Sequence, residues 1–115
     1  MSRIPSGGGT EVLKTKSGLI RNATTSVLTV DALHIVTIIS INIANEATSK
    51  LDDFEMMIHD GTADRYIIRK QSIPGNGTFV YSDKLVLQPA HVLKIKEADW
   101  ANLHYWISYI EQDWS

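Results

Sequence analysis

The stretch that decides the fold is residues 33–44, which read LHIVTIISINIA. Its β-branched side chains favour a strand, because branching at Cβ restricts rotamers in a helix and packs well on a pleated sheet. Alternation would place on one face Leu33, Ile35, Thr37, Ile39, Ile41 and Ile43, and on the other His34, Val36, Ile38, Ser40, Asn42 and Ala44. Since the second face is half apolar, we expect a central strand, covered on both sides along part of its length.

Further short strands are predicted around this one, separated by turn-forming residues such as Asp60-Gly61 and those at 74–77. They are Ser26–Val30, Phe54–His59, Tyr66–Lys70, Thr78–Tyr81, Leu85–Leu87, Val92–Lys96 and Tyr105–Glu111. Short strands at regular spacing predict an all-β chain with a single antiparallel β-sandwich, of jelly-roll or immunoglobulin-like topology, over residues 11–115. Residues 1–10 contain Pro5 and three consecutive glycines, and are expected to form an extended N-terminal arm.

The composition is that of an ordinary soluble domain. The 115 residues are 43% hydrophobic and 21% charged, and this length suits a single core. A net charge of -2 disfavours nucleic acid as a partner, and the absence of cysteine removes disulfides and thiolate chemistry. No apolar run approaches the roughly 20 residues of a membrane span, and the N-terminus lacks the apolar region of a signal peptide. We therefore expect synthesis in the cytoplasm and no membrane partner.

Residues that could carry chemistry are scattered. The histidines, which are the first candidates for a metal site, have no second ligand at an informative spacing: His34, His59, His91 and His104. The acidic cluster Asp52, Asp53 and Glu55 lacks a glycine-turned loop and is interpreted as a solvated strand entry. Neither a nucleophile elbow nor a phosphate-binding loop is present. The sequence thus predicts no catalytic residue, cofactor or metal, and a protein that is not an enzyme.

Aromatic residues crowd the last sixteen positions: Trp100, Tyr105, Trp106, Tyr109 and Trp114. In a strand, alternation places Tyr105 and Tyr109 on one face and Trp106 on the other. One row would then belong to the core and the other would meet a neighbour, since large aromatics are enriched at contact sites. A sugar-stacking platform is the alternative interpretation.

Several motifs occur in a recognisable order: V-T-I-I-S-I-N-I-A-N at 36–45, H-D-G at 59–61, Y-I-I-R-K-Q-S-I-P-G-N-G-T at 66–78, D-K-L-V-L-Q-P at 83–89, V-L-K-I-K at 92–96 and I-S-Y-I-E at 107–111. This order resembles a family of small β-sandwich virion proteins of tailed bacteriophages, over about residues 30 to 112. In that family an asparagine closes the long strand, an Ile-Pro-x-Gly segment leads into a turn, and a Ser-Tyr-x-Glu strand ends the domain.

The resemblance implies a structural protein of the phage particle, made in the host cytoplasm and located in the virion. The preferred role is a capsid decoration or cement protein that acts as a homo-oligomer, with a trimer as the expected form, and binds major capsid or neck and tail proteins. The residues expected to bind partners are Arg3, Ile4, Pro5, Trp100, Tyr105, Trp106 and Trp114. Alternatives are a neck, tail or fibre-attachment component, a carbohydrate-binding module, and an enzyme in which His59 or His91 meets a carboxylate in a pocket.

Overall fold

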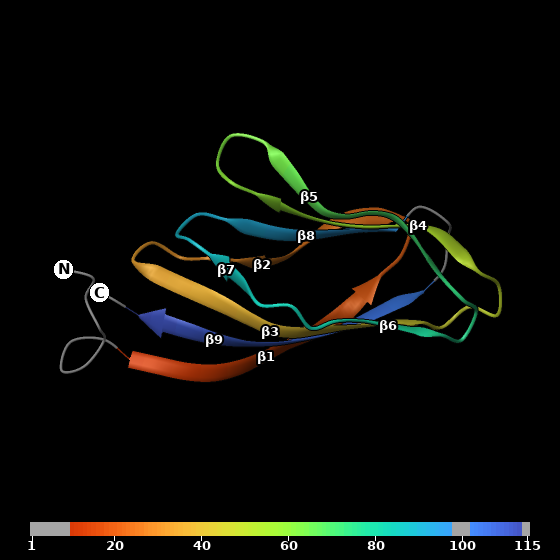
Figure 1. Ribbon diagram of the computed structural model, residues 1–115, viewed down its shortest axis with the longest axis horizontal. Helices are drawn as coiled ribbons and strands as arrows, with labels where there is room; N and C mark the ends of the chain where they lie inside the picture. Colours follow the sequence, from red (N-terminus) through yellow and green to blue (C-terminus); the bar gives the residue numbers. More distant parts are fainter. Residues whose placement is uncertain (1–9, 98–101, 114–115) are drawn as a thin grey trace.

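The computed structural model describes residues 10–97 and 102–113, and within these ranges nine strands form two antiparallel sheets that pack face to face (Figure 1). The strands are β1 (Thr10–Ile20), β2 (Ala23–Thr29), β3 (His34–Asn45), β4 (Leu51–His59), β5 (Asp64–Ile73), β6 (Thr78–Tyr81), β7 (Leu85–Leu87), β8 (Val92–Glu97) and β9 (Leu103–Asp113). The predicted antiparallel β-sandwich is confirmed. The described residues include no helix of the length and apolar character that crossing a membrane requires.

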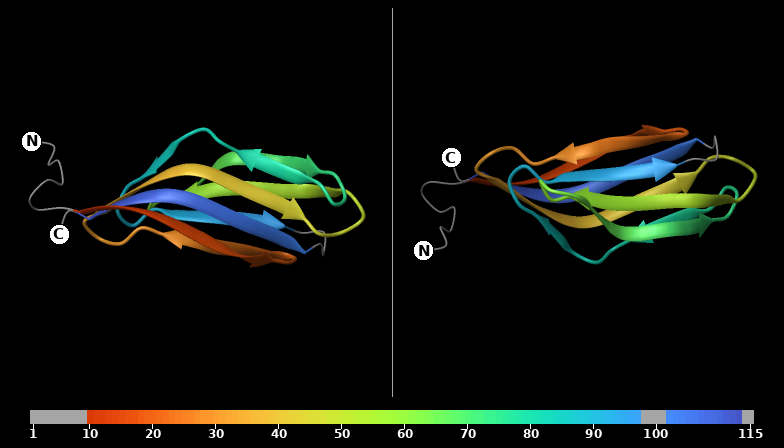
Figure 2. Two further views of the ribbon diagram at one scale, coloured as in Figure 1. Left: turned by 90° about the horizontal axis from the view of Figure 1, so that it is seen from below. Right: turned by 90° about the horizontal axis from the view of Figure 1, so that it is seen from above.

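The order of the strands identifies the topology. Sheet A runs β1-β9-β3-β6, with β7 also paired to β3, and sheet B runs β2-β8-β4-β5. β6 and β7 follow one another along the same edge of β3, so they act as one interrupted strand (Figure 2). Counted in this way, the first of eight strands pairs with the last, the second with the seventh, the third with the sixth and the fourth with the fifth. This nested pairing is the jelly-roll arrangement, the first of the two expected topologies.

The core lies between the sheets and follows the alternation of the strands. β8 buries Leu93 and Ile95 and turns the half-buried lysines between and after them outward, as alternation along a strand requires. β9 buries Tyr105, Ile107 and Tyr109 in the same way, which confirms the prediction that Trp106 faces the opposite side. Most of the core is aliphatic: Ile20, Val27, Leu28, Val30, Val36, Ile38, Ile41, Ile43, Leu51, Ile73, Leu87, Leu93, Ile95, Leu103 and Ile107, joined by Phe54 and Met56.

The predicted alternation of the long strand is wrong in its first half. β3 begins at His34, and Leu33 lies in the preceding turn with a φ of 63° and an exposed side chain. A register shift between Ile38 and Ser40 inserts an extra residue against β9. Such a bulge transfers all preceding side chains to the other face, so that Val36 and Ile38 join Ile41 in the core. The expected central position is confirmed, since β3 lies between β9 and the β6–β7 edge.

Asn45, at the end of β3, ties two turns together. Its side chain is buried, and its amide nitrogen donates hydrogen bonds to the carbonyl oxygens of Ser49 at 3.1 Å and Pro74 at 3.2 Å. Its amide oxygen accepts a bond from the backbone N–H of Ala47 at 3.0 Å. The corner after β3 is thereby fixed to the turn between β5 and β6, and buried polar groups at the corner are satisfied.

The β1 strand extends past the core at one end. All its residues from Glu11 to Ser17 are exposed, although the strand is paired with β9 along its whole length. Thr10 pairs with Asp113, so the two described ends of the chain lie side by side at this end of sheet A. Thr10 therefore lies at the extended end of sheet A.

Candidate functional site

The outward side of sheet A, which we call the neutral face, carries almost no charge. The strand registers place there Glu11, Leu13, Thr15, Ser17, Leu19, Thr37, Asn42, Ala44, Val80, Val86, His104, Trp106, Ser108, Ile110 and Gln112. Glu11 is the one carboxylate in this set, which contains no lysine or arginine. Large exposed apolar side chains gather here: Leu13, Leu19, Val80, Val86 and Trp106. Exposed apolar surface gathered in this way is typical of an interaction site.

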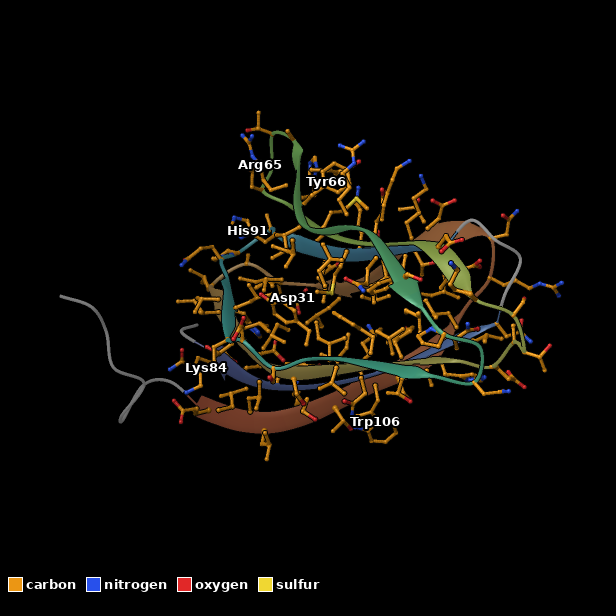
Figure 3. The ribbon with its side chains drawn as sticks, turned by 45° about the vertical axis from the view of Figure 1, so that its right-hand side comes forward. Asp31, Arg65, Tyr66, Lys84, His91 and Trp106 are labelled. Atoms are coloured by element: carbon orange, nitrogen blue, oxygen red, sulfur yellow. The ribbon has the colours of Figure 1, made fainter. Side chains whose placement is uncertain are left out.

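The outward side of sheet B, which we call the charged face, has the opposite character. It presents Glu55, His59, Asp64, Tyr66, Arg69, Lys94 and Lys96. Arg69 lies 4.7 Å from the centre of the Tyr66 ring, and Lys94 contacts Asp64 at 3.2 Å. Figure 3 shows Tyr66 and Trp106 on opposite outer sides of the sandwich.

The side chain of Glu55 lies in a different environment from the one that the sequence predicted. It was expected at a solvated strand entry, but it is buried on the charged face. Its carboxylate oxygens lie 3.7 Å from Nε of Arg69 and 3.9 Å from Nζ of Lys96. The long side chains of these two neighbours cover the carboxylate while their cationic ends reach water.

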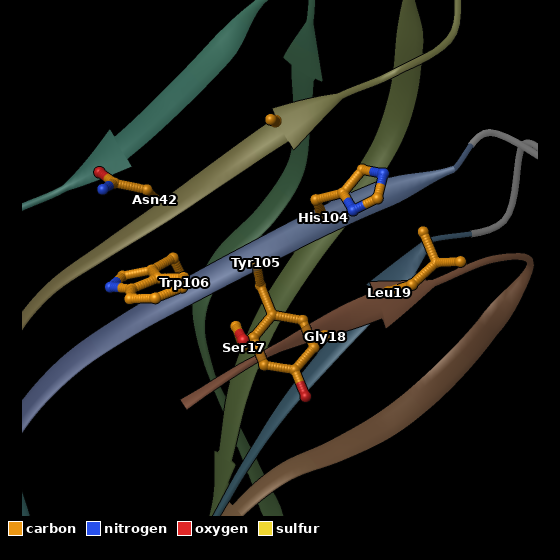
Figure 4. A pocket seen from close by; sticks show the side chains of 8 residues that line it. Ser17, Gly18, Leu19, Asn42, His104, Tyr105 and Trp106 are labelled. Atoms are coloured by element: carbon orange, nitrogen blue, oxygen red, sulfur yellow. The ribbon is translucent and has the colours of Figure 1, made fainter. Parts of the chain in front are cut away.

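A groove of about 510 Å³ indents the neutral face beside Trp106 (Figure 4). Its lining comes from three neighbouring strands: Ser17, Gly18 and Leu19 of β1, Asn42 and Ala44 of β3, and His104, Tyr105 and Trp106 of β9. Trp106 and His104 both project outward from β9, two residues apart, with Leu19 on the adjacent strand. The groove is therefore walled by large side chains over a floor of small ones.

Gly18 fits its place because the ring of Tyr105 packs against it from within. A Cβ on Gly18 would lie 2.6 Å from the Tyr105 hydroxyl oxygen and 2.8 Å from ring carbons. The aromatic ring thus occupies the space that any larger residue would need. Tyr105 supports the groove from the core side, while Trp106 stands on the open side.

The groove has one ionisable pair at its rim. Nε2 of His104 lies 2.6 Å from a carboxylate oxygen of Glu46, and more than half of each side chain is exposed. The backbone N–H of Glu46 also donates to the carbonyl oxygen of Asn102, which fixes the start of the β3–β4 connection beside β9. The rim thereby presents a carboxylate at the end of the groove where β9 begins.

Of the residues expected to bind partners, the structure describes Tyr105 and Trp106. Trp106 is half exposed on the neutral face, and Tyr105 is buried beneath it. Trp100 and Trp114, like the arm residues Arg3, Ile4 and Pro5, lie outside the described residues. Sequence reasoning identified Trp106 but missed Leu19 and Ala44, which reach the groove only through the pairing of three strands.

A second cluster lies on the inward side of sheet A, at its extended end. Glu111 receives Nζ of Lys14 at 2.6 Å and Nδ1 of His34 at 2.6 Å, and Nε2 of His34 lies 3.4 Å from Asp113. The hydrogen bond that His34 donates to Glu111 raises the pKa of His34, and the bonds donated by Lys14 and His34 lower the pKa of Glu111. The hydrogen bond that Lys14 donates to Glu111 also raises the pKa of Lys14.

The same cluster contains three groups of the kinds that bind metal ions. The ligand atoms of Asp31, His34 and Glu111 all lie within 4.8 Å of one another. The two carboxylate oxygens of Glu111, however, are already engaged by Lys14 and His34, and the Lys14 ammonium supplies the positive charge that a cation would bring. The arrangement is explained as an ion-pair network.

The other histidines do not form an enzymatic constellation in the described part of the chain. His59 meets Asp64 at 3.0 Å, but both side chains are more than one third exposed, beside the turn that joins β4 to β5. His91 accepts a hydrogen bond from the backbone N–H of Gln88 at 3.1 Å, which stabilises the turn after β7. Neither histidine lines the groove of the neutral face.

The comparisons with known proteins concern the fold. No protein-family model matches the chain, and no relative is found among curated proteins. A chain of the disulfide-linked pili that form Bacillus endospore appendages superposes with a TM-score of 0.59 and 9% identity, covering 100% of this chain and 98% of that one. A chain in the acidic stable capsid structure of a Helicobacter pylori bacteriophage superposes with a TM-score of 0.53 and 6% identity, covering 93% and 94%. The protein thus shares its fold with chains of a pilus and of a phage capsid.

Proposed function

We propose that the protein is a structural subunit of a phage particle, in the role of a capsid decoration or cement protein, and that it assembles through the neutral face of sheet A. The observation that carries this proposal is the contrast between the two outer faces. Exposed leucine, valine and tryptophan side chains gather on one face, and ion pairs cover the other. The outward strand residues of sheet A named above include no lysine or arginine, so this surface is inexpensive to desolvate, which suits a permanent contact.

The fold and the motif resemblance agree with an assembled role. Both solved structures described above are subunits of large assemblies, one a pilus and one a capsid. The order of motifs in the sequence resembles that in virion proteins of tailed phages. This resemblance supports a place in the phage particle for a chain with this fold. The role needs no catalysis. Location in the virion, a homo-oligomer with a trimer as its expected form, and contact with major capsid, neck or tail proteins are parts of the same proposal.

The experiment that tests this proposal introduces charge on one face at a time. Val80→Glu together with Val86→Glu places two carboxylates on the neutral face, at positions that are more than half exposed. The matched control, Thr24→Glu with Ser26→Glu, places them on the outward side of β2, opposite Lys96 and Lys94. We expect the first variant to lose self-association in sedimentation velocity and the control to keep it. Equal behaviour of the two variants would refute the use of the neutral face.

The proposed location of the protein on the phage capsid is tested by a second experiment. Particles purified from cells that produce the protein should contain it in a fixed copy number per particle, measured by quantitative mass spectrometry, and should show its density on the shell in electron cryomicroscopy. Density confined to the neck or tail would move the assignment to the alternative virion role. Absence of the protein from particles would overturn a virion role altogether.

One observation favours a second function, a carbohydrate-binding module. Trp106 stands half exposed beside Asn42 and His104, so a ring and two polar groups face the same groove. Sugar rings stack on exposed indoles while amide and imidazole groups bind their hydroxyls. A glycan array would give signals that Trp106→Ala abolishes; an array without signal would exclude this function.

A further inference from the structure

We propose that the groove beside Trp106 binds the segment Arg3-Ile4-Pro5 of a second copy of this chain. The inference rests on the proposed assembly through the neutral face and specifies one contact within it. It joins two features that the assembly role leaves unexplained: a groove in the neutral face, and nine residues before Thr10 whose composition suits an extended peptide.

The groove has the chemistry of a peptide site. The half-exposed Trp106 and the exposed Leu19 provide apolar walls, and Gly18 and Ala44 leave room between them. Grooves lined by aromatic side chains are the usual receptors for extended, proline-containing segments. Asn42, also in the lining, offers an amide that can pair with the backbone of a bound peptide.

The segment has the complementary chemistry. A proline disfavours helical backbone at the residue before it, so Ile4 is biased toward the extended form before binding and loses little entropy when bound. Ile4 and Pro5 lie just before the triple glycine, and their apolar side chains can fill a groove between an indole and a leucine. The glycines that follow allow the segment to leave the groove in any direction.

Charge is complementary as well. Residues 1–9 contain Arg3 and no acidic residue. The rim of the groove presents Glu46, whose carboxylate is more than half exposed and is held by His104. An arginine in reach of this carboxylate would form a charge-assisted hydrogen bond and orient the segment along the groove.

The chain's own segment is poorly placed to fill the groove. Ser17, at the near edge of the groove, lies seven residues along β1 from Thr10, a distance of about 24 Å at the rise of an antiparallel strand. Pro5 precedes Thr10 by five residues and Ile4 by six, so even fully extended chains would carry them only about 18 Å and 22 Å. Ile4 and Pro5 would therefore reach no further than the near edge of their own groove, which favours an occupant from another copy.

A contact of this kind is directional, because each copy donates a segment at one end of sheet A and receives another at the groove. Such head-to-tail contacts close into rings when the rotation between copies allows, and a trimer is one such ring. The segment and the groove are at different ends of β1, so both can be engaged at once in every copy.

The absence of cysteine makes a direct test possible with the full chain. Equal amounts of an Ile4→Cys variant and an Ala44→Cys variant are mixed and mildly oxidised, and the linkage between the two introduced cysteines is measured by peptide mass spectrometry. The control replaces Ala44→Cys with Ser26→Cys, an exposed position on the outward side of sheet B. We expect linkage to be at least tenfold greater with Ala44→Cys, and to fall about tenfold or more when that partner also carries Trp106→Ala.

The outcomes separate this inference from the proposed assembly. Equal linkage with Ala44→Cys and Ser26→Cys overturns the inference, whatever the oligomeric state. If the protein self-associates and Val80→Glu with Val86→Glu prevents it, while Ala44→Cys gives no specific linkage, the assembly proposal stands and the segment is misplaced. A monomer without specific linkage refutes both. Glycan binding that depends on Trp106, without specific linkage, assigns the groove to a sugar instead.

Discussion

The two outer faces of the sandwich come from the same alternating pattern and yet have opposite chemistry. Between the buried residues, β8 places Lys94 and Lys96 on the charged face, whereas β9 places Trp106 and Ser108 on the neutral face. Each antiparallel sheet of the sandwich packs one face against the core and exposes the other face to water. Packing in the core therefore explains the residue types on the inward side of each strand only. The outward residues of sheet A and of sheet B have another cause.

The charges associated with the two sheets also differ in position. Sheet B carries its ion pairs outward, where Lys94 meets Asp64 in contact with water. Sheet A carries its ionic cluster inward, at the extended end, where Glu111 is largely covered. Exposed ion pairs contribute little to stability, so the charged face serves solubility more than cohesion. On the neutral face, the charged groups described above are limited to Glu11 and the His104–Glu46 pair at the rim of the groove.

Among the substitutions that separate the two faces, we expect the largest loss of stability from one beneath the groove of the neutral face. Gly18→Ala would place a methyl group against the Tyr105 ring, which must move or displace β1. We expect the free energy of unfolding to fall by about 2 kcal/mol, in the range of overpacked cores. Chemical denaturation followed by tryptophan fluorescence measures it. The control Ser17→Ala, one residue away and outward, should change stability by less than about 0.5 kcal/mol. Similar losses for both variants would contradict the described packing.

A smaller effect, the dependence of stability on pH, is expected from the inward cluster of sheet A. Because the folded-state pKa of His34 is raised above 6.5, its contribution to stability is complete below pH 6.5 and is lost as the pH rises through the folded-state pKa. The pKa of Glu111 is lowered from 4.5, so its contribution is present above pH 4.5 and is lost as the pH falls through the lowered value.

Titration of the imidazole signals by NMR checks this prediction. We expect His34 to titrate above its ordinary pKa in the parent protein, and to return toward it in Glu111→Gln, where the charge that favours the imidazolium is gone. Lys14, Asp31 and Asp113 remain in the variant, so a residual upward shift from the two carboxylates is compatible with the network. A His34 pKa unchanged by Glu111→Gln would show that the contact is not formed in solution.

The smallest expected effect is on the charged face. Glu55→Gln removes a buried charge but keeps its shape, and its partners Arg69 and Lys96 are 63% and 43% exposed. Water screens cations at such positions, so we expect the free energy of unfolding to change by less than about 1 kcal/mol, and the difference to shrink further at high salt. Thermal unfolding at two ionic strengths measures both. Self-association should be unaffected; a loss of it would mean that the charged face also takes part in assembly.

Much of the fold could be predicted from local patterns. Isoleucine-rich alternation identified β3, and turn residues separated most of the other strands. β1 was not delimited as a strand because Lys14 to Ser17 are polar or small, and its stability comes from pairing with β9, which is distant in sequence. The bulge after Ile38 was missed because Ile38 and Ile39 are equally apolar, so either side chain could face the core. Only the partner strand decides between them.

The candidate site was less accessible to sequence reasoning. The opposite orientation of Tyr105 and Trp106 follows from strand periodicity, and it was predicted correctly. The groove itself depends on Leu19 and Ala44, which meet Trp106 only through the registers of three strands. The same holds for His34 and Glu111, which are 77 residues apart in the chain. Register is a property of the whole sheet, and short motifs carry no information about it.

Asn45 restricts which residue types can hold the corner after β3. Its amide is used in both senses, donating to Ser49 and Pro74 and accepting from Ala47. Aspartate lacks the donor and alanine lacks both groups, so either substitution would leave backbone groups of the corner without this partner. The two turns that the amide joins would then be held together by fewer hydrogen bonds, and we expect the corner to open more readily.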